Sequence, residues 1–242
     1  MFALLLVAAA QPQPPSAAAD GPFRLAAHEV VCRHEYGRFP PACEIGLELR
    51  WEAPLVVVRV AQTELTGWTP NTFPSGKIAA SGTRHRTVVR AAGVTRTVLK
   101  LPVLEAAFTV TAAKRMLTFT VPDFAAPKSL TEAGVTLTPH SPRRLDALLE
   151  VRLDLLYPEG HPEFESFESW TVGNRCRLVH GDGRTLEPVN GDEDARGRGV
   201  ACTYRFNAAE VGNVAGWSLR LDTPGPLREL PVRFILRDIP LP

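Results

Sequence analysis

The sequence predicts an all-β protein built from two antiparallel β-sandwiches in tandem, and three observations lead to this prediction. Apolar and polar residues alternate with a period of two through most of the chain, whereas the period of 3.6 expected of helices is nearly absent. Turn-forming Gly, Pro, Asn and Asp separate these short segments, which is typical of sandwiches. The 242 residues suit two sandwiches, because one sandwich takes about 100 residues.

The first predicted sandwich covers residues 22–114. Its opening segments alternate clearly, and we expect the first two to pair across a loop that contains Gly and Pro. Pro102 in the last segment predicts an edge position or a bulge, because proline offers no N–H to a neighbouring strand. The expected strands are Phe23–Arg33, Cys43–Trp51, Leu55–Leu65, Arg84–Arg90 and Arg96–Val110.

The second predicted sandwich covers residues 115–242. Leu145–Tyr157 could begin as a helix, but its apolar residues alternate with charged ones, which favours a strand. The Asp182-Gly183 pair predicts a hairpin within Arg175–Pro188, with a type I′ turn in which both residues take positive φ. The other expected strands are Met116–Val121, Gly134–Thr138, Gly199–Asn207, Trp217–Thr223 and Glu229–Ile239, and Phe206–Val214 could hold one helical turn.

The chain ends on Leu230–Pro242, LPVRFILRDIPLP, which we predict to be the closing strand of the second sandwich. Its first half alternates as a strand does, and its two final prolines stop the strand because they lack the N–H of an added ladder bond. Deletion of the segment is therefore predicted to unfold the second sandwich. The residues expected in that core are Val232, Phe234 and Leu236.

Residues 1–19 indicate a secretory signal peptide. The apolar run Phe2–Ala10 has the length of a signal h-region and is too short to span a bilayer, which needs about 20 residues. Small residues place a cleavage site after Ala10 or after Ala19, although a positively charged n-region is missing. We therefore expect a protein that is secreted or periplasmic and has no membrane span.

The four cysteines support export, because disulfides persist mainly outside the cytoplasm. Four cysteines allow three pairings, and we favour the two local ones, Cys32–Cys43 and Cys176–Cys202. Each would stabilise the fold by about 2–4 kcal/mol through restriction of the unfolded chain. A metal site is the alternative, although no C-x-x-C or H-x-x-x-H pair gives a standard zinc spacing. Its ligands would be His28, Cys32, His34 and Cys43.

The net charge of +1 argues against nucleic acid or an anionic membrane as the partner. Arginine supplies most of the positive charge, since lysine occurs only at Lys77, Lys100, Lys114 and Lys128. Arginine binds phosphate and carboxylate groups in a bidentate way, so a surface for such groups is one interpretation. The codon usage of a GC-rich genome is the other, and it also accounts for the many Ala, Pro and Gly.

Several strand sequences resemble a group of uncharacterised exported bacterial proteins with paired immunoglobulin-like (Ig-like) sandwiches. The similar segments are LTFTVPDF, VRLDLLYPEG, ESFESWTVGNRCRLVHGDGRTLEP and LPVRFILRDIPLP, with LRWEAPLVVVRV in the first half and YRF at Tyr204–Phe206. The resemblance implies the fold and export. It supplies no activity and no site residues.

Common catalytic motifs are missing from the sequence, which has no G-x-S-x-G, H-E-x-x-H, P-loop or Rossmann fingerprint. Two acidic segments are candidates for calcium binding or, in the first, for paired glycosidase carboxylates, and solvated loops explain both as well. They are residues 159–168, with Glu159, Glu163, Glu165 and Glu168, and residues 191–197, where Asp182 could join Asp192, Glu193 and Asp194. Trp68 and Phe73 lie in a loop rich in Thr, Pro and Gly and form the best candidate contact surface.

These features together predict an exported, non-enzymatic module for binding, structure or interaction. Its partner would be an extracytoplasmic protein or a polysaccharide, and no cofactor is implied. The alternative is an exported hydrolase or a calcium-dependent adhesin-like domain that uses the acidic loops 159–168 and 191–197. A hydrolase should bring at least two of these acids and a histidine into one cleft.

Overall fold

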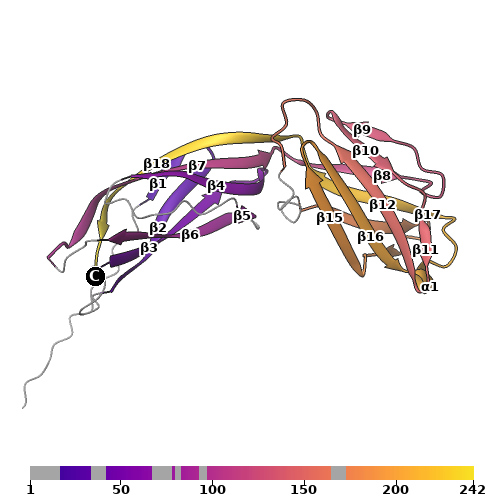
Figure 1. The fold of residues 1–242 in the computed structure, drawn as a ribbon, viewed down its shortest axis with the longest axis horizontal. Coiled ribbons are helices and arrows are strands. Elements are labelled where there is room, and N and C mark those ends of the chain that lie inside the picture. Colours follow the sequence, from indigo (N-terminus) through magenta and orange to yellow (C-terminus); the bar gives the residue numbers. More distant parts are fainter. Residues whose placement is uncertain (1–16, 34–41, 67–77, 80–82, 93–96, 165–172) are drawn as a thin grey trace, which may run out of the picture.

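The fold is nearly all antiparallel β, as the alternation predicts (Figure 1). The structure is a computed structural model that describes residues 17–33, 42–66, 78–79, 83–92, 97–164 and 173–242. Within these ranges the only helix, α1 (Ala208–Val211), is a single turn. The strands are β1 (Ala17–Asp20), β2 (Phe23–Arg33), β3 (Ala42–Trp51), β4 (Val56–Thr66), β5 (Ile78–Ala79), β6 (Arg84–Ala92), β7 (Lys100–Ala113), β8 (Met116–Val121), β9 (Leu130–Glu132), β10 (Val135–Pro139), β11 (Arg143–Leu145), β12 (Leu148–Leu156), β13 (Arg175–His180), β14 (Thr185–Leu186), β15 (Asn190–Arg196), β16 (Gly199–Asn207), β17 (Trp217–Pro224) and β18 (Leu227–Pro240).

The strands form four sheets that enclose two apolar cores (Figure 1). In the first sandwich the sheet β1-β2-β3-β6 faces the sheet β18-β7-β4-β5. In the second, the sheet β15-β16-β12-β10-β9, with β11 paired to β12, faces the sheet β14-β13-β17-β8. The chain crosses between the sandwiches twice, from β7 to β8 and from β17 to β18.

The first core is built from alternate residues of the strands on either side of it. Ile45, Leu47 and Leu49 of β3 are buried, as the period of two requires. Phe108 of β7 and Phe234 of β18 meet edge to face, with ring centroids 6.1 Å apart. Each fully buried side chain of this size contributes about 1.5–3 kcal/mol, so this core carries most of the stability of the first sandwich.

The second core contains two large side chains whose polar ends are satisfied. The Tyr157 hydroxyl lies 3.0 Å from Thr223 Oγ1, and Trp217 Nε1 donates to the Val211 carbonyl at 3.0 Å. Buried tyrosine and tryptophan need such partners because an unpaired polar group costs free energy. Residues from strands of the first sandwich also belong to this core, which makes the junction between the sandwiches a packed one. They are Val58, Ala113 and Leu227.

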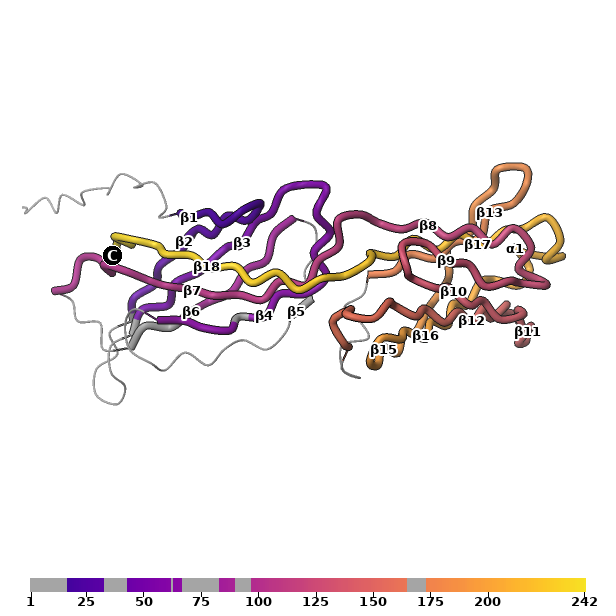
Figure 2. Tube along the Cα trace, turned by 90° about the horizontal axis from the view of Figure 1, so that it is seen from above, coloured from indigo at the N-terminus to yellow at the C-terminus, as the bar shows by residue number. Residues whose placement is uncertain are grey.

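The C-terminal strand does not close the second sandwich, so that expectation is wrong. β18 pairs with β7 along its whole length, and Figure 2 shows the two running side by side through the first sandwich. Val232, Phe234 and Leu236 are buried as the alternation predicts, but in the first core. The first sandwich therefore contains strands from both ends of the chain, and the range 115–242 does not form one unit.

Three local expectations also need correction. Only Gly183 of the Asp182-Gly183 pair has positive φ, and His180 N donates to Arg184 O, so the hairpin has a three-residue loop and no type I′ turn. The acidic segment 191–197 was predicted to be a loop, but most of it forms the edge strand β15. The first sandwich begins earlier than residue 22, because β1 pairs with β2. Cleavage after Ala19 would remove most of β1, whereas cleavage after Ala10 would keep it.

The cysteines form one of the two expected disulfides. Cys32 and Cys43 lie directly opposite each other on β2 and β3 and are bonded. Cys176 of β13 and Cys202 of β16 are free thiols, so the second expected disulfide is wrong for this structure. They lie on the two facing sheets of the second sandwich and are buried in its core. Burial raises the pKa of Cys202 to about 12 and that of Cys176 well above its ordinary value.

Thiol counting tests this assignment. Native protein should react with iodoacetamide at least about 100-fold more slowly than unfolded protein, because burial and the raised pKa values remove the reactive thiolate. In guanidinium chloride without reductant we expect two reactive thiols per chain. Mass spectrometry of the alkylated peptides should place the label on Cys176 and Cys202. A count of zero in the unfolded protein would show that these two residues are bonded. A count of four would show that Cys32 and Cys43 are not bonded.

Candidate functional site

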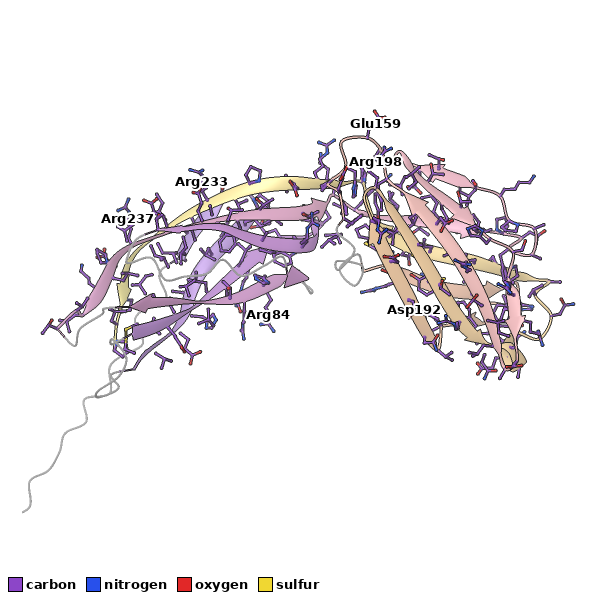
Figure 3. All side chains as sticks on the ribbon, viewed as in Figure 1. Arg84, Glu159, Asp192, Arg198, Arg233 and Arg237 are labelled. Carbon is purple, nitrogen blue, oxygen red and sulfur yellow. A yellow bond between two sulfur atoms is a disulfide. The ribbon has the colours of Figure 1, made fainter. Side chains whose placement is uncertain are left out.

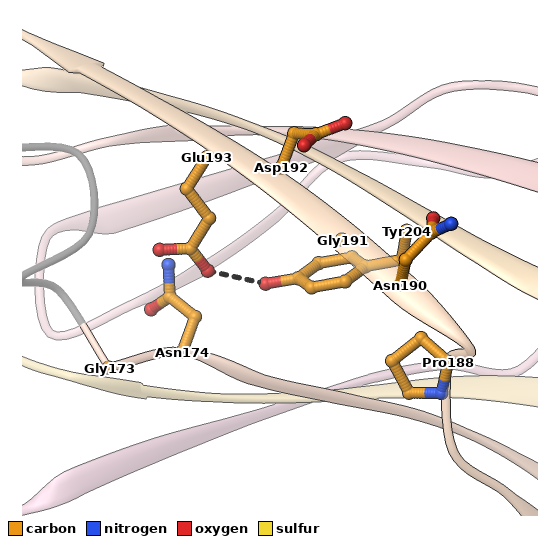
Figure 4. A pocket seen from close by; sticks show the side chains of 8 residues that line it. All are labelled: Gly173, Asn174, Pro188, Asn190, Gly191, Asp192, Glu193 and Tyr204. Atoms are coloured by element: carbon orange, nitrogen blue, oxygen red, sulfur yellow. Dashed lines mark hydrogen bonds between the residues drawn. The ribbon is translucent and has the colours of Figure 1, made fainter.

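A pocket of about 540 Å³ opens beside β15 and β16 of the second sandwich (Figure 4). Its size falls within the usual range for small-ligand sites, about 300–1,000 Å³. Most of its polar atoms are hydrogen-bond acceptors. The lining residues are Gly173, Asn174, Pro188, Asn190, Gly191, Asp192, Glu193 and Tyr204.

The alternation of β15 distributes its polar residues between two walls of the pocket. Glu193 points inward and is half-buried, whereas Asn190 and Asp192 lie on the outer face and are exposed. Gly191 lies opposite Tyr204 in the ladder, and a Cβ at Gly191 would come within 2.7 Å of the Tyr204 ring. A glycine is therefore required here for the close approach of the tyrosine, which forms the floor of the pocket.

The inner wall is a buried polar cluster. The Tyr204 hydroxyl donates to Glu193 Oε1 at 2.7 Å (Figure 4). Asn174 Nδ2 lies 3.6 Å from Cys202 Sγ. Burial raises the pKa of the Glu193 carboxyl, and hydrogen bonds from Tyr204 and Asn174 oppose that shift. Asn174 Oδ1 is buried and accepts no hydrogen bond from the residues that the structure describes. Such an acceptor is uncommon among described buried groups, and a ligand or a water molecule could supply the donor.

The outer wall is held by one arginine. Arg205 Nη1 donates to Asp192 Oδ2 at 2.7 Å and to Asn190 Oδ1 at 3.2 Å, and its Nε donates to Glu150 Oε2 at 3.2 Å. Because both pocket residues share this guanidinium, their side chains are fixed in position while Asp192 remains exposed to solvent. The rim therefore presents a preorganised set of oxygen acceptors.

The four weak calcium candidates do not converge. Asp182 lies in the turn after β13, where it accepts from Arg184 N and Nε, and these bonds hold the pKa of its carboxyl well below the usual range. Asp192 is paired with Arg205, Glu193 faces inward and Asp194 is exposed. In the described part of the chain no group of three or more His, Cys, Asp or Glu side chains is placed to hold a metal ion.

The acidic segment 159–168 is divided between different surroundings. Glu159 lies beside the junction of the sandwiches, away from Asp192 (Figure 3). Phe164 is buried and its backbone bonds Gly197, so it anchors the segment to the second core. Glu165 and Glu168 lie outside the described residues, as do Trp68 and Phe73. Because Asp192 and Glu193 project to opposite sides of β15, these two carboxylates cannot face each other across a scissile bond.

A buried histidine lies at the junction. His161 is only 6% exposed, and its ring stacks on Tyr157 with centroids 4.1 Å apart. Neither ring nitrogen has a hydrogen-bond partner among the described residues. Burial lowers the pKa of His161 to about 4, the Pro162 backbone opposes this shift, and the positive charges of Arg59 and Arg198 add to it. The ring is therefore neutral at ordinary pH and serves as a packing element.

Comparison of the chain with protein-family models, with curated proteins and with solved structures gives no match. In the described ranges, no helix has the length and apolar character needed to cross a membrane. Sequence reasoning missed Asn174, Asn190 and Tyr204 as lining residues. A signal for the site was present in NGDEDAR, where Glu193 and Ala195 occupy alternate positions between charged residues, as in an edge strand with one buried side.

Proposed function

We propose that the protein is a non-enzymatic binding module of two Ig-like sandwiches that acts outside the cytoplasm, and that its pocket takes a small hydroxyl-rich ligand of about one or two sugar units. The disulfide Cys32–Cys43 supports an oxidising location. The antiparallel sandwich is a common scaffold on which edge strands and loops carry binding sites. A polysaccharide or glycan outside the cell is the natural source of such a ligand.

The observation that carries the proposal is Asn174 Oδ1, which accepts no hydrogen bond from the described residues and lies at the inner wall of an acceptor-rich pocket. Asn190, Asp192 and Glu193 add further oxygen acceptors on the other sides. A ligand that satisfies several acceptors at once must be rich in donors, and neighbouring hydroxyl groups on a sugar ring meet this requirement. Pro188 supplies an apolar surface for the carbon face of such a ring.

Calorimetric titration with neutral mono- and disaccharides tests the proposal. We expect Asp192→Ala to bind the recognised sugar at least about tenfold more weakly than the wild type, because hydrogen bonds to a charged group contribute about 1.5–3 kcal/mol. Asp194→Ala is the matched control, since Asp194 is exposed on the same strand and does not line the pocket. Its affinity should stay within about twofold. Equal losses in the two variants, no binding at millimolar sugar, or release of cleaved product would contradict the proposal.

A further inference from the structure

The outer face of the sheet β1-β2-β3-β6 carries four arginines in register. Arg24, Arg50 and Arg84 lie directly opposite one another on β2, β3 and β6. Arg86 lies in the next row, opposite Glu48. We call these four residues the arginine row. Their side chains are 52%, 65%, 60% and 58% exposed in sequence order, so all four guanidinium groups reach solvent.

A single buried carboxylate organises three members of the arginine row. Glu48 is 4% exposed and bonds the Nε atoms of Arg50 and Arg86, the latter at 2.6 Å, while Arg84 Nη1 lies 4.0 Å away. The hydrogen bonds from Arg86 and Arg50 hold the pKa of Glu48 below its ordinary value, so this carboxylate stays ionised. The bonds to Glu48 use the Nε atoms, and the side chains of Arg50 and Arg86 are more than half exposed, so their guanidinium groups are accessible to an anion.

The arginine row carries more positive than negative charge, and this excess lowers the stability of the sheet. Glu48 and Glu52, which pairs with Arg24 at 3.3 Å, balance two of the four positive charges. Like charges directly opposite each other on adjacent strands destabilise a sheet, and here three arginines occupy such positions in succession. An anionic ligand would neutralise this repulsion, so the arginine row is suited to bind a negatively charged group.

The geometry points to a linear acidic polymer. Neighbouring strands lie about 4.8 Å apart, so Arg24, Arg50 and Arg84 form a line of evenly spaced charges about 10 Å long. A single phosphate would contact only part of this line, whereas a chain with a repeated anionic group can follow it. The described residues of this face include no Phe, Tyr or Trp on which nucleic acid bases could stack. The chain's net charge of +1 gives no general attraction to nucleic acid or to an anionic bilayer.

We propose that the arginine row binds an acidic polysaccharide, with carboxylate or sulfate groups as the recognised chemistry. An extracytoplasmic protein meets such polymers in quantity, and the disulfide of β2 and β3 lies in this same sheet. The site is on the first sandwich and does not rest on the pocket of the second. One surface would then hold the polymer by charge while the pocket recognises a neutral sugar.

Binding of two acidic polymers, polygalacturonate and dextran sulfate, tests the proposal, with neutral dextran as the blank. At low salt we expect both acidic polymers to bind, dextran not to bind, and the affinity to fall as salt screens the charges. Arg50→Gln/Arg84→Gln should bind about tenfold more weakly, because two exposed ion pairs contribute about 0.7 kcal/mol each. A stronger effect with one polymer identifies carboxylate or sulfate as the preferred group.

The matched control is Arg228→Gln/Arg233→Gln, which removes the same charge from exposed positions of β18 on the other sheet. Figure 3 shows Arg233 and Arg84 on opposite sides of the first sandwich. This control should keep its affinity within about twofold and its melting temperature near that of the wild type, because exposed substitutions change stability little. The melting temperature of Arg50→Gln/Arg84→Gln is measured beside it, because Arg50 bonds the buried Glu48 carboxylate. Absence of polymer binding, an equal loss in both double variants, or tighter binding to vesicles of anionic phospholipid would overturn the proposal.

Discussion

Deletion of Leu230–Pro242 is expected to unfold the first sandwich and to leave the second folded. The segment carries Val232, Phe234, Leu236 and Ile239 into the first core. At about 1.5–3 kcal/mol for each buried side chain the loss is about 6–12 kcal/mol, which equals the whole stability of a typical domain. Leu227, the only β18 residue in the second core, remains in the shortened chain.

Hydrogen exchange followed by mass spectrometry would show which sandwich unfolds after the deletion. We expect amide protection to disappear in β3 and to persist in β12, because these strands belong to different sandwiches. Two neighbouring substitutions supply a matched test in the full-length chain. Phe234→Ala should lower the free energy of unfolding by about 3–5 kcal/mol, whereas Ile235→Ala, at a position that is 47% exposed, should change it by less than about 1 kcal/mol. Loss of protection in β12 with β3 intact would show that the strand stabilises the second sandwich after all.

Acid is expected to weaken the protein through His161. Its pKa is about 4 in the folded state and 6.5 ordinarily, so between these values the unfolded chain binds a proton that the folded chain does not. The stabilisation from the neutral ring is complete above pH 6.5, decreases as the pH falls, and is lost near pH 4. We expect this residue to account for about 2–3 kcal/mol of the free energy of unfolding.

Denaturant unfolding at pH 7 and pH 4 of the wild type and of His161→Phe would measure this contribution. The variant should lose about 2–3 kcal/mol less than the wild type across this range, because phenylalanine fills the same space and binds no proton. The comparison is needed because other groups also titrate, among them Glu48, whose lowered pKa adds to the acid effect. Burial lowers the pKa of His85, which adds to the acid effect, and raises that of Glu193, which opposes it. His140→Gln, an exposed control, should follow the wild type, and a pH dependence shared by all three proteins would exclude His161 as the cause.

Strand positions and buried faces were predictable because they depend on local pattern. The alternation in Phe23–Arg33 and Met116–Val121 gave the bounds of β2 and β8 as the structure has them. The buried positions of β18 were also correct, since the period of two fixes which side chains share a face. β15 was predicted as a loop, because an edge strand with one buried side exposes charged residues that resemble those of a loop.

The candidate sites could be predicted only in part. Arginine enrichment was visible in the composition, but the arginine row depends on the register of β2, β3 and β6, which brings together residues up to 62 positions apart. Asp192 and Glu193 were singled out as acids, whereas Tyr204 meets Glu193 through the pairing of β15 with β16, and only Asn174 joins them through the packing of two sheets. Cys176 and Cys202 were correctly placed in strands, but no sequence pattern reports whether two buried sulfur atoms are bonded.

The sequence alone determined that the chain is β throughout, where most strands lie and which of their residues are buried. Those properties follow from side-chain alternation within a few residues. Only the tertiary structure decided that β18 returns to β7, that Glu193 of β15 meets Tyr204, and that three arginines align across one sheet with Arg86 in the next row. The reason is that backbone hydrogen bonds are the same for nearly every residue, so a strand with a suitable face can pair with several partners. The choice among them is made by how all the strands pack together.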